Sequence, residues 1–389
     1  MNAMFTSPSE ARRVATAKDT DAYRATRTVL SAFSLDPCRG KRFLLKPNAG
    51  RCAAPGAGVT TNPDVVAAAI DAFNEAGATV AVGESPIAGV NTLEALEACG
   101  IATVARERNC PLIDMDARQY VKVAVPEGEA IDHLRVCPEA LEFDSVVSIP
   151  VMKTHMHTGV TLAVKNMKGC LWRRSKVDLH MLPTQDRKDA RSLEIAIADM
   201  ASVLRPDFSI IDGTIGMEGL GPSAGTPKPL HVVLAAPDAF AADAVACNLM
   251  GRNAEDIPHL RLGAERGYGV IDLARLHVSP DNWQSFGDPF AAAPKNLAIE
   301  FPDVTIYDNQ SCSACQSTLF LFLRKHGSEL REYFPDGDPI NIAIGKGHAE
   351  LPKGTLCIGN CTACHRDQGV FVAGCPPVNS TILKTLRSQ

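Results

Sequence analysis

The sequence predicts a mainly parallel, doubly wound α/β sheet that is followed by a cysteine-rich C-terminal α+β module. Two observations support this prediction. Between residues 42 and 250, short apolar segments alternate with amphipathic segments, and this alternation is typical of βα units in a parallel sheet. In the last quarter of the chain, six of the thirteen cysteines gather at spacings that indicate a metal site.

Five apolar segments predict strands, over residues 42–46, 79–83, 145–149, 208–212 and 231–235. Helices are expected over residues 63–76, 189–204 and 238–250. Asn62 is the expected cap of the first helix, and Pro63 occupies its first position, where the missing amide hydrogen would have no partner anyway. A polar, proline-containing stretch over 279–295 marks the expected boundary between an α/β domain of residues 1–280 and the C-terminal module of residues 296–389.

Composition and charge argue against several classes of protein. The chain has 389 residues with 46% apolar content, enough for two or three domain cores. Its formal charge is −5 and it has no long basic run, so a nucleic acid is not an expected partner. No segment reaches the roughly twenty apolar residues of a membrane-spanning helix. We therefore expect a soluble cytoplasmic protein, whose reduced thiols serve as ligands rather than as disulfides.

One segment, residues 150–169, carries more reactive side chains than any other. It directly follows the expected strand 145–149, so its side chains should lie at the carboxyl edge of the sheet, where open α/β sheets bind ligands. We expect Lys153, His155 and Lys165 to be catalytic, because lysine and histidine can bind an anion or exchange a proton with it. The alternative is a solvated loop followed by a surface helix with ordinary lysines.

Glycine-rich turns follow two other expected strands, at residues 56–62 and 213–225. Backbone amides that are free of side chains can bind a carboxylate or a phosphate, although the glycine spacing does not match a dinucleotide-binding fingerprint. The alternative for both turns is a flexible crossover, and the carboxylate of Glu84 could equally cap a turn. The residues expected to bind a small anionic molecule are Lys46, Asn48, Thr61, Glu84, His157, Asn166, Asp212 and Gly213.

These residues belong to a set of motifs that resembles domain-of-unknown-function family 362. The motifs are Lys46-Pro47-Asn48, Thr60-Thr61-Asn62-Pro63, Gly83-Glu84-Ser85, Lys153-Thr154-His155, the run 160–169, and Asp212-Gly213. The resemblance covers roughly residues 40–250 and implies the α/β fold. Proteins of this family often carry a ferredoxin-like iron–sulfur segment, so the resemblance also implies such a cluster. This chain lacks the compact Cys-x2-Cys-x2-Cys-x3-Cys-Pro run, which argues against a ferredoxin fold but not against a cluster.

The cysteines of the last quarter predict a [4Fe–4S] cluster. We expect Ser311 to cap a helix that carries Cys312 and Cys315 in its first turn, where the helix dipole favours thiolates. Cys361 and Cys375 are expected in turns, which leave the sulfur and nearby amides free to surround a cluster. These four cysteines are therefore the predicted metal ligands.

Other interpretations of the same cysteines stay open. A structural zinc site would use the same four ligands without doing chemistry. Cys357 is expected within a strand and Cys364 is a reserve ligand, so either could replace one of the four. A redox dithiol at residues 312 and 315 is a third interpretation, but the βαβ start that precedes such a pair in thioredoxin-like proteins is absent.

The sequence thus indicates an iron–sulfur protein whose α/β domain binds a small anionic molecule. The first hypothesis is a redox-linked or cluster-assisted enzyme, either an oxidoreductase or a lyase, with an electron-transfer partner protein. The competing hypothesis is a non-catalytic electron carrier or ligand-binding protein with a structural zinc or iron–sulfur site.

Overall fold

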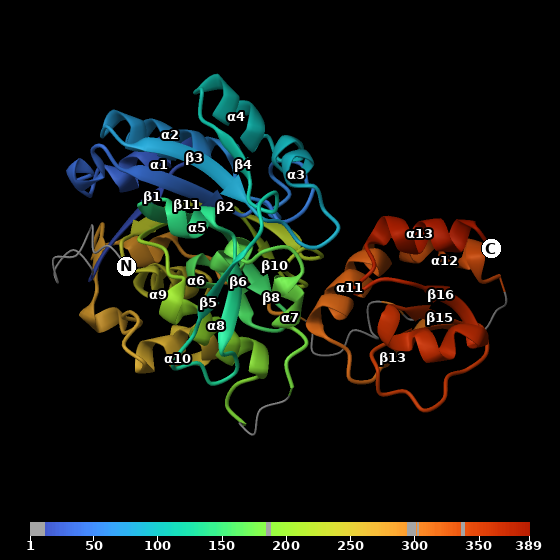
Figure 1. Ribbon diagram of the computed structural model, residues 1–389. Coiled ribbons are helices and arrows are strands. Elements are labelled where there is room, and N and C mark those ends of the chain that lie inside the picture. Colours follow the sequence, from blue (N-terminus) through green and yellow to red (C-terminus); the bar gives the residue numbers. More distant parts are fainter. Residues whose placement is uncertain (1–11, 184–187, 294–300, 302, 336–338) are drawn as a thin grey trace. The chain divides into compact units, whose positions relative to one another are not determined.

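The computed structural model describes residues 12–183, 188–293, 301, 303–335 and 339–389. The chain divides into two compact units, and the division falls between Ala292 and Ala293 (Figure 1). This position lies within the polar stretch 279–295 that the sequence analysis marks as a boundary.

The first unit is built on a ten-stranded sheet. Its strands are β1 (Arg13–Lys18), β2 (Arg42–Pro47), β3 (Thr79–Glu84), β4 (Leu112–Asp114), β7 (Ser145–Ile149), β8 (Val151–His155), β9 (Gly159–Thr161), β10 (Phe208–Glu218), β11 (Thr226–Ala236) and β12 (His277–Ser279). The order is β12-β1-β11-β10-β7-β2-β3-β4, and β8 and β9 extend the sheet beside β10. From β10 to β4 all neighbours are parallel, whereas β11 is antiparallel to β1 and β10. The mainly parallel α/β sheet predicted from the sequence is thereby confirmed.

Helices cover both faces of this sheet (Figure 1). They are α1 (Ala22–Leu30), α2 (Pro63–Glu75), α3 (Thr92–Ala98), α4 (Ile101–Glu107), α5 (Glu139–Glu142), α6 (Ala163–Asn166), α7 (Ser175–Asp178), α8 (Ser192–Val203), α9 (Ala239–Leu249) and α10 (Pro258–Glu265). Side chains of β2 alternate between the faces: Phe43 and Leu45 pack in one core with α1 and α2, and Leu44 packs in the other with α8, α9 and α10. A separate two-stranded ribbon is formed by β5 (Val121–Ala124) and β6 (His133–Val136).

One segment that was expected to be a turn, and one for which a loop was the alternative, form strands instead. Asp212 ends the expected strand, but β10 continues through Gly213 to Glu218, because the backbone here goes on pairing with β11, with Gly213 opposite Val232. Lys153 and His155 lie in β8, which pairs with β9. The alternative of a solvated loop with ordinary surface lysines is wrong, since Lys153, His155 and Lys165 are all buried.

The second unit has a four-stranded sheet whose order follows the chain: β13 (Val304–Asp308), β14 (Ile340–Ile344), β15 (Thr355–Ile358) and β16 (Gly369–Val372). Its helices are α11 (Ser313–His326), α12 (Leu330–Tyr333) and α13 (Asn379–Arg387). Every strand pair is parallel, so each connection is a crossover rather than a hairpin. The unit is therefore α/β in arrangement, and the expectation of an α+β module is wrong in this respect.

Candidate functional site

The first unit contains a group of buried basic side chains that we name the basic cluster: Lys153 and His155 of β8, Lys165 of α6, Lys168, and His259 of α10. Each of these side chains is less than a tenth exposed. Burial, followed by the charge of Lys165, lowers the pKa of His155, Lys168 and His259. Lys165 is therefore close enough to these three side chains for its charge to affect their protonation.

The neighbouring Lys46 is a buried lysine whose charge is neutralised by a carboxylate. It is the next-to-last residue of β2, and its Nζ lies 2.8 Å from Oε2 of Glu84, at the end of β3. Both side chains are almost fully buried. The carboxylate of Glu84 also accepts hydrogen bonds from the backbone amides of Ala49 and Ser85, at 3.0 and 2.9 Å. Lys46 and Glu84, both expected to bind substrate, thus form a buried ion pair.

Two asparagines connect this ion pair to the basic cluster. Oδ1 of Asn166 accepts from Nδ2 of Asn48 at 3.1 Å and from Nζ of Lys46 at 3.4 Å. Oδ1 of Asn48 in turn accepts from Nζ of Lys153 at 3.0 Å, and the same ammonium donates to the carbonyl of Val59 at 2.8 Å. The partners of Lys153 are therefore neutral acceptors.

Lys165 has a single, long hydrogen bond among the described residues. Its Nζ donates to Oγ1 of Thr161 at 3.3 Å. Burial and then the charge of Lys153 lower the pKa of Lys165 to about 7. Burial and then the charge of Arg51 likewise lower the pKa of Lys153 to about 7. Both amines therefore exchange protons near neutral pH.

Lys168 and the histidines complete this part of the molecule. Nζ of Lys168 lies 2.7 Å from Nε2 of His180. Nδ1 of His155 accepts from the backbone amides of His157 and Thr158, at 3.1 and 3.3 Å, so the ring carries its proton on Nε2. The rings of His155 and His157 lie edge to face, with centroids 5.8 Å apart.

Three other residues predicted to bind substrate hold the backbone of the site. Oγ1 of Thr61 donates to the carbonyl of Ile149 at 2.6 Å. The carboxylate of Asp212 accepts from the backbone amides of Asn62 and Thr214, at 2.7 and 2.9 Å, and so fixes the start of α2. A Cβ on Gly213 would lie 2.8 Å from the carbonyl oxygen of Val232, so this glycine permits close pairing of β10 and β11.

The second candidate site lies in the C-terminal unit, at the carboxyl edge of its parallel sheet. Cys312 and Cys315 follow β13, Cys361 follows β15, and Cys375 follows β16. Because the carboxyl ends of parallel strands share one edge, the four predicted ligands lie at the same edge. The hydrogen bond that Cys315 donates to Cys312 raises the pKa of Cys315, and burial and then the charges of Cys312, Cys361 and Cys375 raise it further.

The start of α11 differs by one residue from the expectation. The helix begins at Ser313, so Cys312 and not Ser311 is the N-cap residue. The hydrogen bond with Cys315, together with backbone amides at the helix start, lowers the pKa of Cys312 to about 6 against the opposing effect of burial. Cys312 thus has the character of a thiolate.

The two reserve cysteines have different surroundings. Cys357 lies in β15 and is buried, and its Sγ donates to the carbonyl of His365 at 3.7 Å. Cys364 is exposed. Within the described part of the chain, no three cysteine, histidine or acidic side chains are gathered closely enough to hold a single metal ion.

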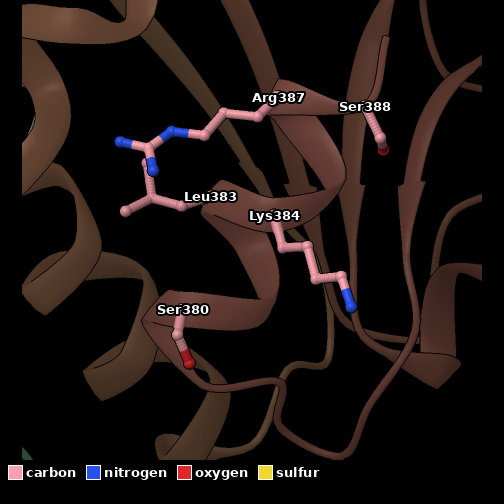
Figure 2. Close-up of a pocket in the computed structure, with 5 residues that line it drawn as sticks. All are labelled: Ser380, Leu383, Lys384, Arg387 and Ser388. Atoms are coloured by element: carbon pink, nitrogen blue, oxygen red, sulfur yellow. The ribbon is translucent and has the colours of Figure 1, made fainter.

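A shallow hollow of about 300 Å³ lies along α13 of the same unit. Figure 2 shows its lining, which consists of Ser380, Leu383, Lys384, Arg387 and Ser388. A hydrogen bond with Tyr333 raises the pKa of Arg387, so this cation already has a partner. None of these residues was expected from the sequence to belong to a functional site.

Comparison with known proteins places the first unit in a family. Residues 43–248, more than half of the chain, match the family described as "Domain of unknown function (DUF362)". The chain belongs to this family. The resemblance found in the sequence is thereby confirmed for this DUF362 protein.

A curated relative of this DUF362 protein is "Thylakoid-associated protein sll1697" of Synechocystis sp. (strain ATCC 27184 / PCC 6803 / Kazusa). It is 31% identical over 252 residues, which cover 63% of this chain and 76% of the relative. Two solved structures are also similar, each at 12% identity. One is the lactate racemase apoprotein from Thermoanaerobacterium thermosaccharolyticum, with a TM-score of 0.45 over 65% of this chain. The other is a protein from Thermotoga maritima, with a TM-score of 0.36 over 68% of this chain. The matches cover 60% and 61% of the two solved chains, which is less than two thirds of either.

Among the described residues of this DUF362 protein, none of the helices combines the length and the apolar character needed to span a bilayer. A cytoplasmic location stays a prediction.

Proposed function

We propose that this protein binds a small carboxylate- or phosphate-bearing molecule at the basic cluster, and that Lys165 exchanges a proton with it. One observation carries the proposal. Lys153, Lys165 and Lys168 are buried, yet no described carboxylate forms an ion pair with any of them. A buried ammonium without a counter-ion is costly, and a bound oxyanion would supply the missing negative charge.

The comparison with Lys46 supports the same proposal. Lys46 is buried to a similar degree, and Glu84 neutralises it. The fold therefore supplies a counter-ion for Lys46 but, among the described residues, none for the three lysines of the basic cluster. Leaving three lysines without one destabilises the free protein, and such a cost is typical of a binding site.

The chemistry of the proposed site follows from its two amines with a pKa of about 7, Lys153 and Lys165. General acid–base catalysis is most efficient when the pKa of the catalytic group lies near the working pH. Lys165 has one weak hydrogen bond, so its Nζ is the more available of the two amines. In this proposal Lys153 orients the anion, and Lys165 donates or accepts the proton.

Binding is tested by calorimetry with acetate and with phosphate. Wild-type protein should bind at least one of these anions, and Lys165→Met should weaken binding by about tenfold or more, the effect of losing one buried charged hydrogen bond. Lys122→Met, at an exposed lysine of β5 in the same unit, is the control and should leave binding unchanged. If neither anion binds to the wild type, or if both variants bind alike, the proposed site is wrong.

The catalytic part of the proposal needs a separate measurement. A carboxylate that binds is incubated with the protein in deuterium oxide, and exchange at its carbon-bound hydrogens is followed by NMR. Exchange that is lost in Lys165→Met supports an enzyme. Binding without exchange supports the competing hypothesis of a ligand-binding protein.

We further propose that the C-terminal unit holds a [4Fe–4S] cluster through Cys312, Cys315, Cys361 and Cys375. Four thiolates are the usual ligand set of such a cluster. The thiolate character of Cys312 and the gathering of four thiols at one sheet edge support it. A bound cluster would supply one-electron transfer, and an electron-transfer partner protein belongs to this proposal.

Iron, zinc and acid-labile sulfide are measured in protein prepared without oxygen. About four irons and four sulfides per chain are expected, with loss of both in Cys375→Ser. Cys364→Ser is the matched control, because this exposed cysteine lies outside the proposed set. Zinc without sulfide would establish the structural alternative, and the absence of iron and zinc would contradict both.

A further inference from the structure

His259 is a buried histidine that the sequence analysis does not name. It is the second residue of α10 and is 0% exposed. Neither of its ring nitrogens has a hydrogen-bond partner among the described residues. A neutral imidazole carries one donor and one acceptor, and leaving either unsatisfied in a protein interior is unfavourable. A side chain of this kind requires an explanation.

The fold places this histidine beside Lys165 of the basic cluster. The start of α10 packs closely on β9, since a Cβ on Gly159 would lie 2.6 Å from Cδ1 of Ile257. Strand β9 ends at Thr161, whose hydroxyl accepts from Lys165. The charge of Lys165 acts on His259 after burial does, although no hydrogen bond joins the two side chains. They are therefore neighbours, and a third group in contact with both would satisfy the ring nitrogens of His259.

The ionisation state of His259 limits what that third group can be. Burial, and then Lys165, lower the pKa of His259 to about 3. The ring therefore stays neutral at physiological pH and adds no charge for a second anionic group. It can donate to or accept from a neutral oxygen, such as that of a hydroxyl or a carbonyl. His155 differs, because its Nδ1 is already occupied by two backbone amides.

We propose that His259 contacts the ligand and selects small oxyanions that carry a neutral hydroxyl or carbonyl oxygen next to the anionic group. The anionic group lies on Lys165, and the neutral oxygen lies on the imidazole of His259. This inference rests on the proposed anion site and specifies which class of anion the site accepts. His259 is thus a specificity-determining residue that α10 contributes.

The experiment compares acetate with glycolate, two carboxylates that differ by one hydroxyl. Wild-type protein should prefer glycolate by about 3- to 10-fold, the range that one net hydrogen bond provides. In His259→Leu the two dissociation constants should become equal while acetate binding persists. His259→Gln, which keeps one donor and one acceptor, should retain part of the preference.

A stability measurement separates this role from a structural one. The His259 ring makes no hydrogen bond with the described residues, so His259→Leu should have a Tm no lower than that of the wild type. A lower Tm together with an unchanged glycolate preference would show that the histidine only supports the fold, and would overturn the inference. Acetate and glycolate binding equally to the wild type would also overturn it while leaving the anion site intact. If neither binds and Lys165→Met has no effect, the anion site itself fails.

Discussion

At the scale of single residues, the buried lysines of the first unit differ in their partners rather than in their burial. Lys46 is 1% exposed and Lys165 is 8% exposed, but a carboxylate neutralises Lys46 alone. Removing one member of a buried ion pair leaves the other charge buried without a counter-ion, which is unfavourable. Removing an unpaired buried lysine relieves such a penalty. Substitutions at the two positions should therefore change stability in opposite directions.

Lys46→Met is expected to lower the free energy of unfolding by about 3–5 kcal/mol, because it leaves Glu84 buried without its partner. Lys165→Met is expected to raise the free energy of unfolding by about 1–3 kcal/mol at pH 7, because the apolar methionine side chain replaces a buried amine that has no counter-ion. Urea unfolding followed by tryptophan fluorescence measures both effects. The two tryptophans of the chain, Trp172 and Trp283, belong to the first unit. A destabilised Lys165→Met would show that Lys165 already has an adequate partner in the free protein.

The same lysines predict the pH dependence of anion binding. The pKa values of Lys153 and Lys165 are about 7 in the free protein, and a bound anion favours the charged form and raises them. Binding must then take up protons above pH 7, so affinity should fall as pH rises. A fall of about tenfold per pH unit between pH 7 and 9 is expected for each lysine that the anion keeps protonated. Calorimetry across this range gives the slope, and Lys165→Met should make it shallower.

The contribution of Lys165 to stability depends on pH in the opposite direction to anion affinity. A lysine whose folded pKa is about 7 binds fewer protons than the unfolded chain between pH 7 and about 10.5. The contribution of Lys165 to stability therefore rises with pH in this window. If anion affinity falls toward alkaline pH while the stability of the free protein does not fall, unfolding is excluded as the cause of the lower affinity.

At the scale of helices and strands, hydrophobic period and capping residues predict most of the central sheet. Residues 42–46, 79–83 and 145–149 are apolar between polar boundaries, and they form β2, β3 and β7. Asn62 caps α2 as expected, since its side chain accepts from the amide of Asp64. These signals are local, so they can be read without knowledge of the tertiary structure.

The errors occur where glycine and histidine suggest a loop but the backbone pairs with a distant strand. The expected turn at 213–225 contains the second half of β10, because β11 provides partners for its backbone. Lys153 and His155 lie in a short strand for the same reason, with β10 on one side and β9 on the other. His259 was missed because only the packing of α10 on β9 brings it beside Lys165.

Helix α6 carries Lys165, and one buried carboxylate fixes its start. Oδ1 and Oδ2 of Asp243 accept from the backbone amides of Ala163 and Val164, at 2.7 and 3.0 Å. Asp243→Asn should lower the free energy of unfolding by about 1–2 kcal/mol, because an amide side chain has one acceptor oxygen for two donors. Anion affinity should also fall several-fold, although Asp243 acts only by positioning α6.

Asp281→Asn serves as the control for this effect, since Asp281 is exposed. It should change neither stability nor affinity. If Asp243→Asn loses stability but binds anions like the wild type, the position of α6 does not control the site.

At the scale of the whole molecule, each unit has a hydrophobic core of its own. The first unit packs its helices on both faces of the large sheet. In the second unit, Phe322 of α11, Ile342 of β14, Leu356 of β15 and Ile382 of α13 are fully buried. Units with separate cores commonly unfold in separate steps, so a single free energy of unfolding does not describe the chain.

Loss of the proposed metal centre should therefore affect one unfolding step alone. In protein prepared without oxygen, differential scanning calorimetry is expected to show two transitions, and tryptophan fluorescence should follow only the one that belongs to the first unit. Cys375→Ser should lower the other transition by several degrees or abolish it, because a bound centre stabilises the folded form that holds it. Cys364→Ser should leave both transitions in place. In Cys375→Ser, the fluorescence transition of the first unit could instead shift as far as the calorimetric transition of the second unit. That result would mean that the units unfold together, and that the cysteines also support the α/β sheet of the first unit.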